Sequence, residues 1–74
     1  MSAEYVVIIE KSASGFGAYV PDLPGCVAVG ETRDETLQLI REAIELHVHS
    51  LREAGESVPL PTSTTARVSV NTAA

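Results

Sequence analysis

Cys26, the only cysteine in the chain, is the first side chain to consider as a nucleophile. It directly follows Pro24 and Gly25 and opens an apolar run. A reactive thiolate needs a base or a positive environment, yet the flanking charged residues Asp22 and Glu31 are both acidic. The sequence therefore favours a buried, unreactive thiol over a catalytic one.

Two histidines, His47 and His49, are the next candidates, as metal ligands. They stand two residues apart in an expected helix, so their side chains point about 200° apart around its axis. Histidines that share a metal ion on one helix are spaced so that they lie on the same face, as an i, i+4 pair does. We therefore expect no metal site and interpret both histidines as surface or partner-facing residues.

Glu10, Glu42 and Glu45 are the carboxylates that could serve a nuclease. The expected element order resembles a truncated ribonuclease H-like fold, whose nucleases hold two metal ions with acids from the first strand, the helix and the fourth strand. Glu10 ends the expected first strand and the other two lie on the expected helix, but the expected last strand has no acid. We expect no catalytic residue, no cofactor and no enzymatic activity.

The elements that would position these residues follow from the apolar patterning. β-Branched and aromatic runs predict strands, and a long amphipathic run predicts one helix. The order is β-β-β-α-β, an α+β fold in which one mostly antiparallel sheet packs on one helix. The expected strands cover residues 5–9, 16–20, 26–29 and 66–70, and the expected helix covers residues 33–54.

Turn and cap residues mark the ends of these elements. Pro24 and Gly25 fit the central positions of a type II turn, in which the glycine takes a positive φ. Thr32 and Glu35 form a capping box at the expected start of the helix. Gly55 stands where a helix C-terminal stop is expected. The stretch from Pro21 to Gly30 is thus interpreted as a structural loop and strand.

Composition limits the functions that the chain can have. Seventy-four residues predict a single domain, residues 1–74, with a small core. The formal net charge of −5 opposes nucleic-acid phosphates, so we expect no nucleic-acid binding through this chain alone. No apolar run is long enough to span a membrane, and no signal peptide precedes the first strand. A cytoplasmic location is expected.

The expected helix carries apolar residues on more than one side. One stripe must face the sheet: Leu37, Ile40, Ile44, Val48 and Leu51. A second group, Leu39, Ala43 and Leu46, is expected on the opposite side among polar residues. The expected first strand is also apolar on both faces, and one helix covers only one face of a sheet. We therefore expect a homo-oligomer, a dimer or tetramer, with scattered surface leucines as the alternative.

The block Pro21-Asp22-Leu23-Pro24-Gly25-Cys26, followed by Gly30-Glu31-Thr32 and the helix, resembles the HicB antitoxin family over residues 4–70. This resemblance implies a partial ribonuclease H-like domain without catalysis, which binds and neutralises HicA, a small basic toxin that cleaves mRNA. Many members of that family carry a C-terminal DNA-binding segment. This chain stops at Ala74, so we do not expect it to bind operator DNA.

The resemblance places a HicA-like toxin first among possible partners. A self-associating structural or ligand-binding domain without a toxin is the alternative, and a small hydrolase is a distant third. The residues expected at a partner or oligomer interface are Leu39, Ala43, Leu46, Asp22, Glu31 and Asp34.

Overall fold

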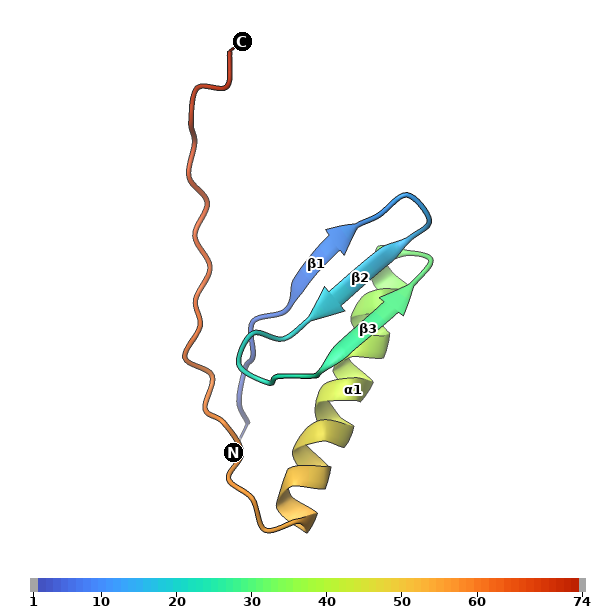
Figure 1. Cartoon of the computed structure of the whole chain (residues 1–74), viewed down its shortest axis with the longest axis vertical. Helices are drawn as coiled ribbons and strands as arrows, with labels where there is room; N and C mark the ends of the chain where they lie inside the picture. The colour runs from blue at the N-terminus through green and yellow to red at the C-terminus, as the bar shows by residue number, and fades with distance from the viewer. Residues whose placement is uncertain (1, 74) are drawn as a thin grey trace.

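A three-stranded sheet and one helix form the folded body of the chain (Figure 1). The computed structural model describes residues 2–73. The elements are β1 (Ile8–Lys11), β2 (Phe16–Tyr19), β3 (Val27–Gly30) and α1 (Arg33–Glu53). The predicted α+β class, with three antiparallel strands followed by one helix, is confirmed.

The sheet is antiparallel throughout, in the order β1-β2-β3, and α1 covers one of its faces. Ile9, Ala18 and Ala28 lie side by side across the three strands on the helix-facing side. The two alanines allow the helix to approach β2 and β3 closely. Since side chains alternate along a strand, Ile8, Tyr19 and Val27 form the neighbouring row on the opposite face.

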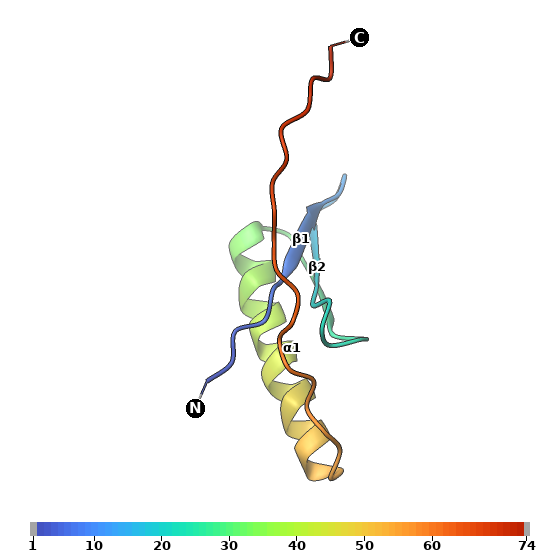
Figure 2. The same ribbon diagram turned by 90° about the vertical axis from the view of Figure 1, so that its left-hand side faces the viewer.

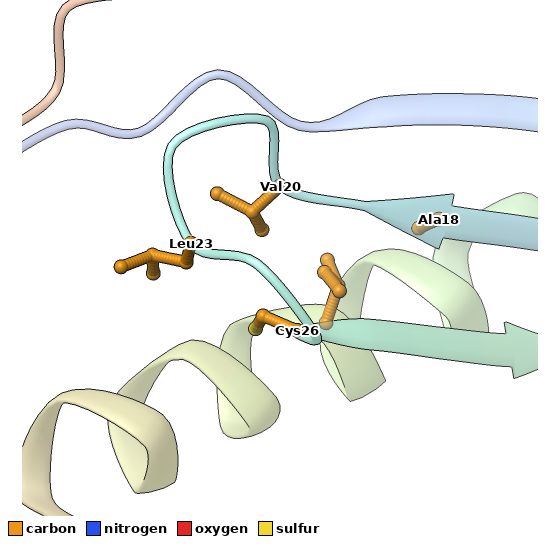
Figure 3. Close-up of a cluster of buried hydrophobic side chains, with 5 residues drawn as sticks. Ala18, Val20, Leu23 and Cys26 are labelled. Carbon is orange, nitrogen blue, oxygen red and sulfur yellow. The ribbon is translucent and has the colours of Figure 1, made fainter. Parts of the chain in front are cut away.

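The loop between β2 and β3 supplies the centre of the core. The amide of Cys26 donates to the carbonyl of Leu23 at 3.0 Å, and Gly25 has φ 84°. This is the predicted turn, with the glycine in the conformation that a type II turn requires. It directs the side chains of Leu23 and Cys26 into the space above α1, beside Val20 (Figure 3).

Both predicted helix signals are present at the ends of α1. The amide of Glu35 donates to the hydroxyl of Thr32 at 3.1 Å, as in a capping box. The carboxylate of Glu35 accepts from the amide of Glu31 at 2.9 Å, one residue earlier than the usual partner. At the other end Gly55 has φ 72° and its amide donates to the carbonyl of Arg52, which closes the last turn.

Two strand predictions are wrong. The first strand begins at Ile8 rather than residue 5, because Ile8 pairs with Tyr19, the last residue of β2, and the chain then turns into the loop that contains Pro21. Residues 66–70 form no strand within residues 2–73. They are extended, but they lie away from the sheet and have no strand beside them (Figures 1 and 2).

Two contacts hold the start of this C-terminal segment. The hydroxyl of Tyr5 donates to the carbonyl of Pro59 at 2.6 Å. The carboxylate of Asp22 accepts from the amides and hydroxyls of Thr62 and Ser63. Beyond Ser63 the chain leaves the body. Within the described part of the chain, no helix is long and apolar enough to cross a membrane.

Candidate partner interface

One exposed stripe of α1 combines apolar and acidic side chains. At 100° per residue its members fall within a sector of about 60° around the helix axis. Leu46 is 67% exposed and Leu39 is 38% exposed, so both present apolar surface to solvent. We call this surface the acidic stripe; its residues are Glu35, Leu39, Glu42, Leu46 and Glu53.

Leu39 and Leu46 are exposed as the sequence predicts, but Ala43, which lines the same hollow as Leu46, does not lie on the side of α1 opposite the core. Ala43 is half-buried and packs against the core that contains Ile40. It lies about 60° from Ile40 around the helix, so it belongs to the edge of the buried face. Beside it, a hollow between α1 and β3 is lined by Leu46 and Val27.

The face of the sheet that α1 does not cover is also apolar. Val27 and Val29 of β3 are both exposed, Val29 by 77%, and Tyr19 of β2 lies next to Val27. Ile8 of β1 is half-buried and continues the same row. The apolar surface therefore extends from the uncovered sheet face, past Val27 and the hollow, to Leu46 of the acidic stripe.

The three predicted acidic interface residues differ in how free they are. Glu31 and Asp34 are exposed near the start of α1. Asp22 is already occupied: its carboxylate accepts from Ser63 and Thr62 over distances of 2.9–3.2 Å. The backbone amide of Ser63, helped by the two hydroxyls and the Thr62 amide, lowers the pKa of Asp22 below its ordinary value. Asp22 thus ties the C-terminal segment to the loop.

This contact predicts a pH dependence that Asp22→Asn should remove. A carboxyl group whose folded pKa is lowered stabilises its contacts above its unfolded pKa, near 4, and loses them as the pH falls through the folded value. The amide signals of Thr62 and Ser63 should therefore shift in NMR spectra recorded below about pH 4. In Asp22→Asn this titration should be absent, and residues 59–63 should be cleaved faster by a protease at neutral pH.

Asp34→Asn is the matched control, because Asp34 is exposed and makes no hydrogen bond to the C-terminal segment among the described residues. It should leave both the titration and the cleavage rate unchanged. Thr62 and Ser63 signals that still titrate in Asp22→Asn would contradict this assignment.

The side chains considered for catalysis do not form a site. Cys26 is buried against α1, and burial raises the pKa of its thiol, which disfavours the reactive thiolate. Glu10 lies on β1, whereas Glu42 and Glu45 lie on exposed parts of α1. His49 contacts Glu53 at 3.7 Å on the surface of the helix. Residues 2–73 contain no group of three potential metal ligands.

The sequence of residues 5–72 matches the family described as the HicB-like antitoxin of bacterial toxin–antitoxin systems. This chain belongs to that family. The match covers the sheet, the helix and nearly all of the C-terminal segment. Membership of an antitoxin family indicates a non-enzymatic role for the chain.

Several known proteins are similar to this chain in sequence. A UPF0150 protein of Thermoplasma acidophilum is 42% identical over 57 residues, which are 76% of this chain and 83% of the relative. A UPF0150 protein of Helicobacter pylori is 49% identical over 49 residues, 66% of this chain and 67% of that one. A 14.9 kDa protein of Haemophilus phage HP1 is 38% identical over 55 residues, and the match spans 41% of its length.

Solved structures show the same architecture. The N-terminal domain of the Burkholderia pseudomallei antitoxin HicB matches with a TM-score of 0.70 and 42% identity, over 78% of this chain and 69% of that one. A chain of a HicA3–HicB3 toxin–antitoxin complex matches with a TM-score of 0.69 and 32% identity, over 81% of this chain and 70% of that one. The fold of this HicB-like protein is thus the fold of known antitoxin domains.

Sequence patterning does not assign the three glutamates of the acidic stripe to the interface. Glu35 is predicted only as part of the helix cap, Glu42 is considered as a nuclease acid, and Glu53 is not singled out. The signal was available, because Glu35, Leu39, Glu42 and Leu46 recur at spacings of four, three and four residues, which places them on one helix face. The role of Asp22 had no such signal, since its partners lie 40 and 41 residues away.

Proposed function

We propose that this HicB-like protein binds and neutralises a small basic HicA-like toxin that cleaves mRNA, and that it does so through the acidic stripe and without catalysis. The observation that carries the proposal is the stripe itself, with two exposed leucines among three glutamates. Family membership and the similarity to a chain of a HicA3–HicB3 complex support the choice of partner.

A ribonuclease must hold the phosphates of its substrate, so its RNA-binding surface is positively charged. A surface that carries carboxylates at helical spacing can compete for the same positive groups. Glu42 accepts from the side-chain amide of Gln38 at 3.0 Å, and the Glu35 carboxylate is engaged in the helix cap, so both carboxylates are partly ordered before a partner arrives. This order lowers the entropy that binding costs.

Charge and apolar contact have separate roles in this proposal. Exposed carboxylates at the rim of an interface speed the encounter with a basic partner, whereas buried apolar anchors determine how long the complex lasts. Leu46 is the better anchor, because it is the more exposed of the two leucines and lines the hollow beside Val27. Leu39 lies about two helical turns before Leu46 and extends the contact toward the start of α1.

This division predicts how salt changes the binding kinetics. Raising the ionic strength from 0.1 to 1 M shortens the Debye length from about 10 to about 3 Å, so association with the toxin should slow by at least about tenfold. Dissociation should change by less than about threefold, since the apolar anchors are not screened. Surface plasmon resonance with the purified toxin measures both rates.

The proposal is tested by co-expressing the chain with a small basic HicA-like protein from a neighbouring reading frame and following growth. Growth arrest by that protein alone, and rescue by this chain, are the expected results. A partner that arrests growth and is neither bound nor rescued would contradict the proposal. In that case the uncovered sheet face would favour a self-associating domain without a toxin.

A further inference from the structure

The last ten described residues leave the folded body as an extended segment. Val68 and Val70 are 81% and 71% exposed. The backbone of residues 64–70 makes no hydrogen bond to the rest of the described chain. Both views show this segment running alone beyond the sheet (Figures 1 and 2). An extended backbone with alternating valines has the geometry of a strand that lacks a neighbour.

The chain is more extended, and exposes more surface, than a compact monomer of its length, as expected if a partner is missing. Its radius of gyration is 14.7 Å, against about 11 Å for a compact chain of this length. Its accessible surface is 5965 Å², whereas a compact monomer of 7.8 kDa exposes about 4,400 Å². The excess is about twice the ~800 Å² that one partner contributes to a standard interface.

The acceptor for such a strand is the free edge of β1. β1 is an edge strand, since it pairs only with β2. On the helix-facing side of this edge, a groove is lined by apolar residues, Tyr5, Val7, Leu37 and Ile44, and by polar ones that include Asp34, Gln38, Arg41 and Glu45. The edge therefore offers open backbone groups for hydrogen bonding, with a partly apolar groove beside them, which are the two features that an added strand uses.

One register fits both the apolar groups and the charges. If the segment pairs with β1 in the antiparallel direction and Arg67 stands opposite Glu10, then Val68 stands opposite Ile9 and Val70 opposite Val7. Val7 and Ile9 pack against the core on the helix side, so both valines point to that side, and Val70 lies beside the groove that Val7 lines. Arg67 and Glu10 meet on the other face as an opposite-charge pair. If the segment instead ran parallel to β1 with Arg67 opposite Glu10, Val68 would stand opposite the charged Lys11, so the parallel direction fits less well.

The β1 strand of the same chain does not have the direction that antiparallel pairing with the C-terminal segment requires. In both views the C-terminal segment runs in the same general direction as β1 (Figures 1 and 2). A second copy, related by a twofold axis perpendicular to the strands, presents its β1 in the opposite direction. Each copy then supplies one segment and one edge, and the interface is self-complementary.

We propose that two copies of this chain exchange their C-terminal segments, with residues 66–70 of each added as an antiparallel fourth strand to β1 of the other. The exchange covers the edge of β1, which is otherwise an aggregation hazard. It leaves the acidic stripe of both copies free, so it does not depend on the proposed function.

Val68→Asp and Ser69→Asp form the decisive pair of variants. They introduce the same charge at adjacent exposed positions, but only Val68 faces the helix side of the sheet in this register. By light scattering at micromolar concentration, the wild-type chain and Ser69→Asp should be dimers. Val68→Asp should dissociate into monomers of 7.8 kDa, with dimerisation weakened roughly 100-fold because the charge enters both copies of the interface. Helical circular dichroism should be unchanged in all three.

The register is tested by disulfide cross-linking between mixed chains. Residues directly opposite in antiparallel strands have Cα atoms about 4.5–5.5 Å apart, within the range that a disulfide spans. Glu10→Cys chains mixed with Arg67→Cys chains should give a covalent dimer on a non-reducing gel, and each chain alone should not. Cys26 is buried and does not compete.

Three results would overturn the proposal: a monomeric wild-type chain, a Val68→Asp variant that remains dimeric, or mixed cysteine chains that fail to cross-link. A wild-type monomer whose residues 64–70 become protected from hydrogen exchange only when the toxin is added would assign the segment to the toxin instead.

Discussion

Leu23→Ala is expected to lower the free energy of unfolding by about 2–5 kcal/mol at 25 °C. Leu23 is fully buried, at 0% exposure, between the β2–β3 loop and α1 (Figure 3). Truncation of a buried leucine to alanine costs about 2–5 kcal/mol, through lost burial and the cavity that remains. A domain of this length has a total stability of about 4–11 kcal/mol, so the substitution removes a large share of it.

Urea denaturation followed by helical circular dichroism measures this loss. Leu60→Ala is the matched control, because Leu60 is 77% exposed and its truncation should change the free energy of unfolding by less than about 0.5 kcal/mol. Measurements should be made at one protein concentration, since dimerisation adds to the apparent stability. A Leu23→Ala protein within about 1 kcal/mol of wild type would show that the loop is not the centre of the core.

Leu46→Glu is expected to weaken toxin binding by at least about 30-fold while leaving the fold intact. An apolar anchor at the centre of an interface contributes about 2 kcal/mol or more, and a glutamate there adds a desolvation cost. Leu46 is 67% exposed, so the free protein tolerates the change. The rise in Kd should come mainly from faster dissociation, because net charge becomes more negative and continues to favour the encounter.

Leu60→Glu provides the same change at a leucine of similar exposure outside the acidic stripe, and its Kd for the toxin should match wild type within about twofold. Calorimetric titration of the toxin into each variant makes the comparison. Equal Kd values for Leu46→Glu and wild type would remove the acidic stripe from the binding surface. A loss of helical signal in Leu46→Glu would instead place Leu46 in the core.

The local features of the fold were predictable because their causes lie within a few residues. Pro24 and Gly25 dictate their turn, and Thr32 and Glu35 dictate the start of α1 through contacts three residues apart. The apolar stripe around Ile40 likewise follows from helical periodicity. None of these features requires knowledge of where distant parts of the chain lie.

Features that depend on distant contacts were not predictable. The sequence around Val68 has strand patterning, but patterning does not say which edge accepts a strand, or whether that edge belongs to the same chain. Asp22 was read as a surface charge because its partners, Thr62 and Ser63, follow the entire helix. Ala43 was misplaced because an alanine at the margin of a helix face is compatible with either side until the neighbouring strand is known.

The most direct measurement titrates this protein into a ribonuclease assay that contains the purified basic toxin and a labelled RNA. RNA cleavage should stop once the concentration of this protein equals that of active toxin. Leu46→Glu should fail to stop cleavage at the same concentration, and this protein alone should cleave no RNA. Undiminished cleavage at a large excess of correctly folded protein would show that this protein does not neutralise the toxin.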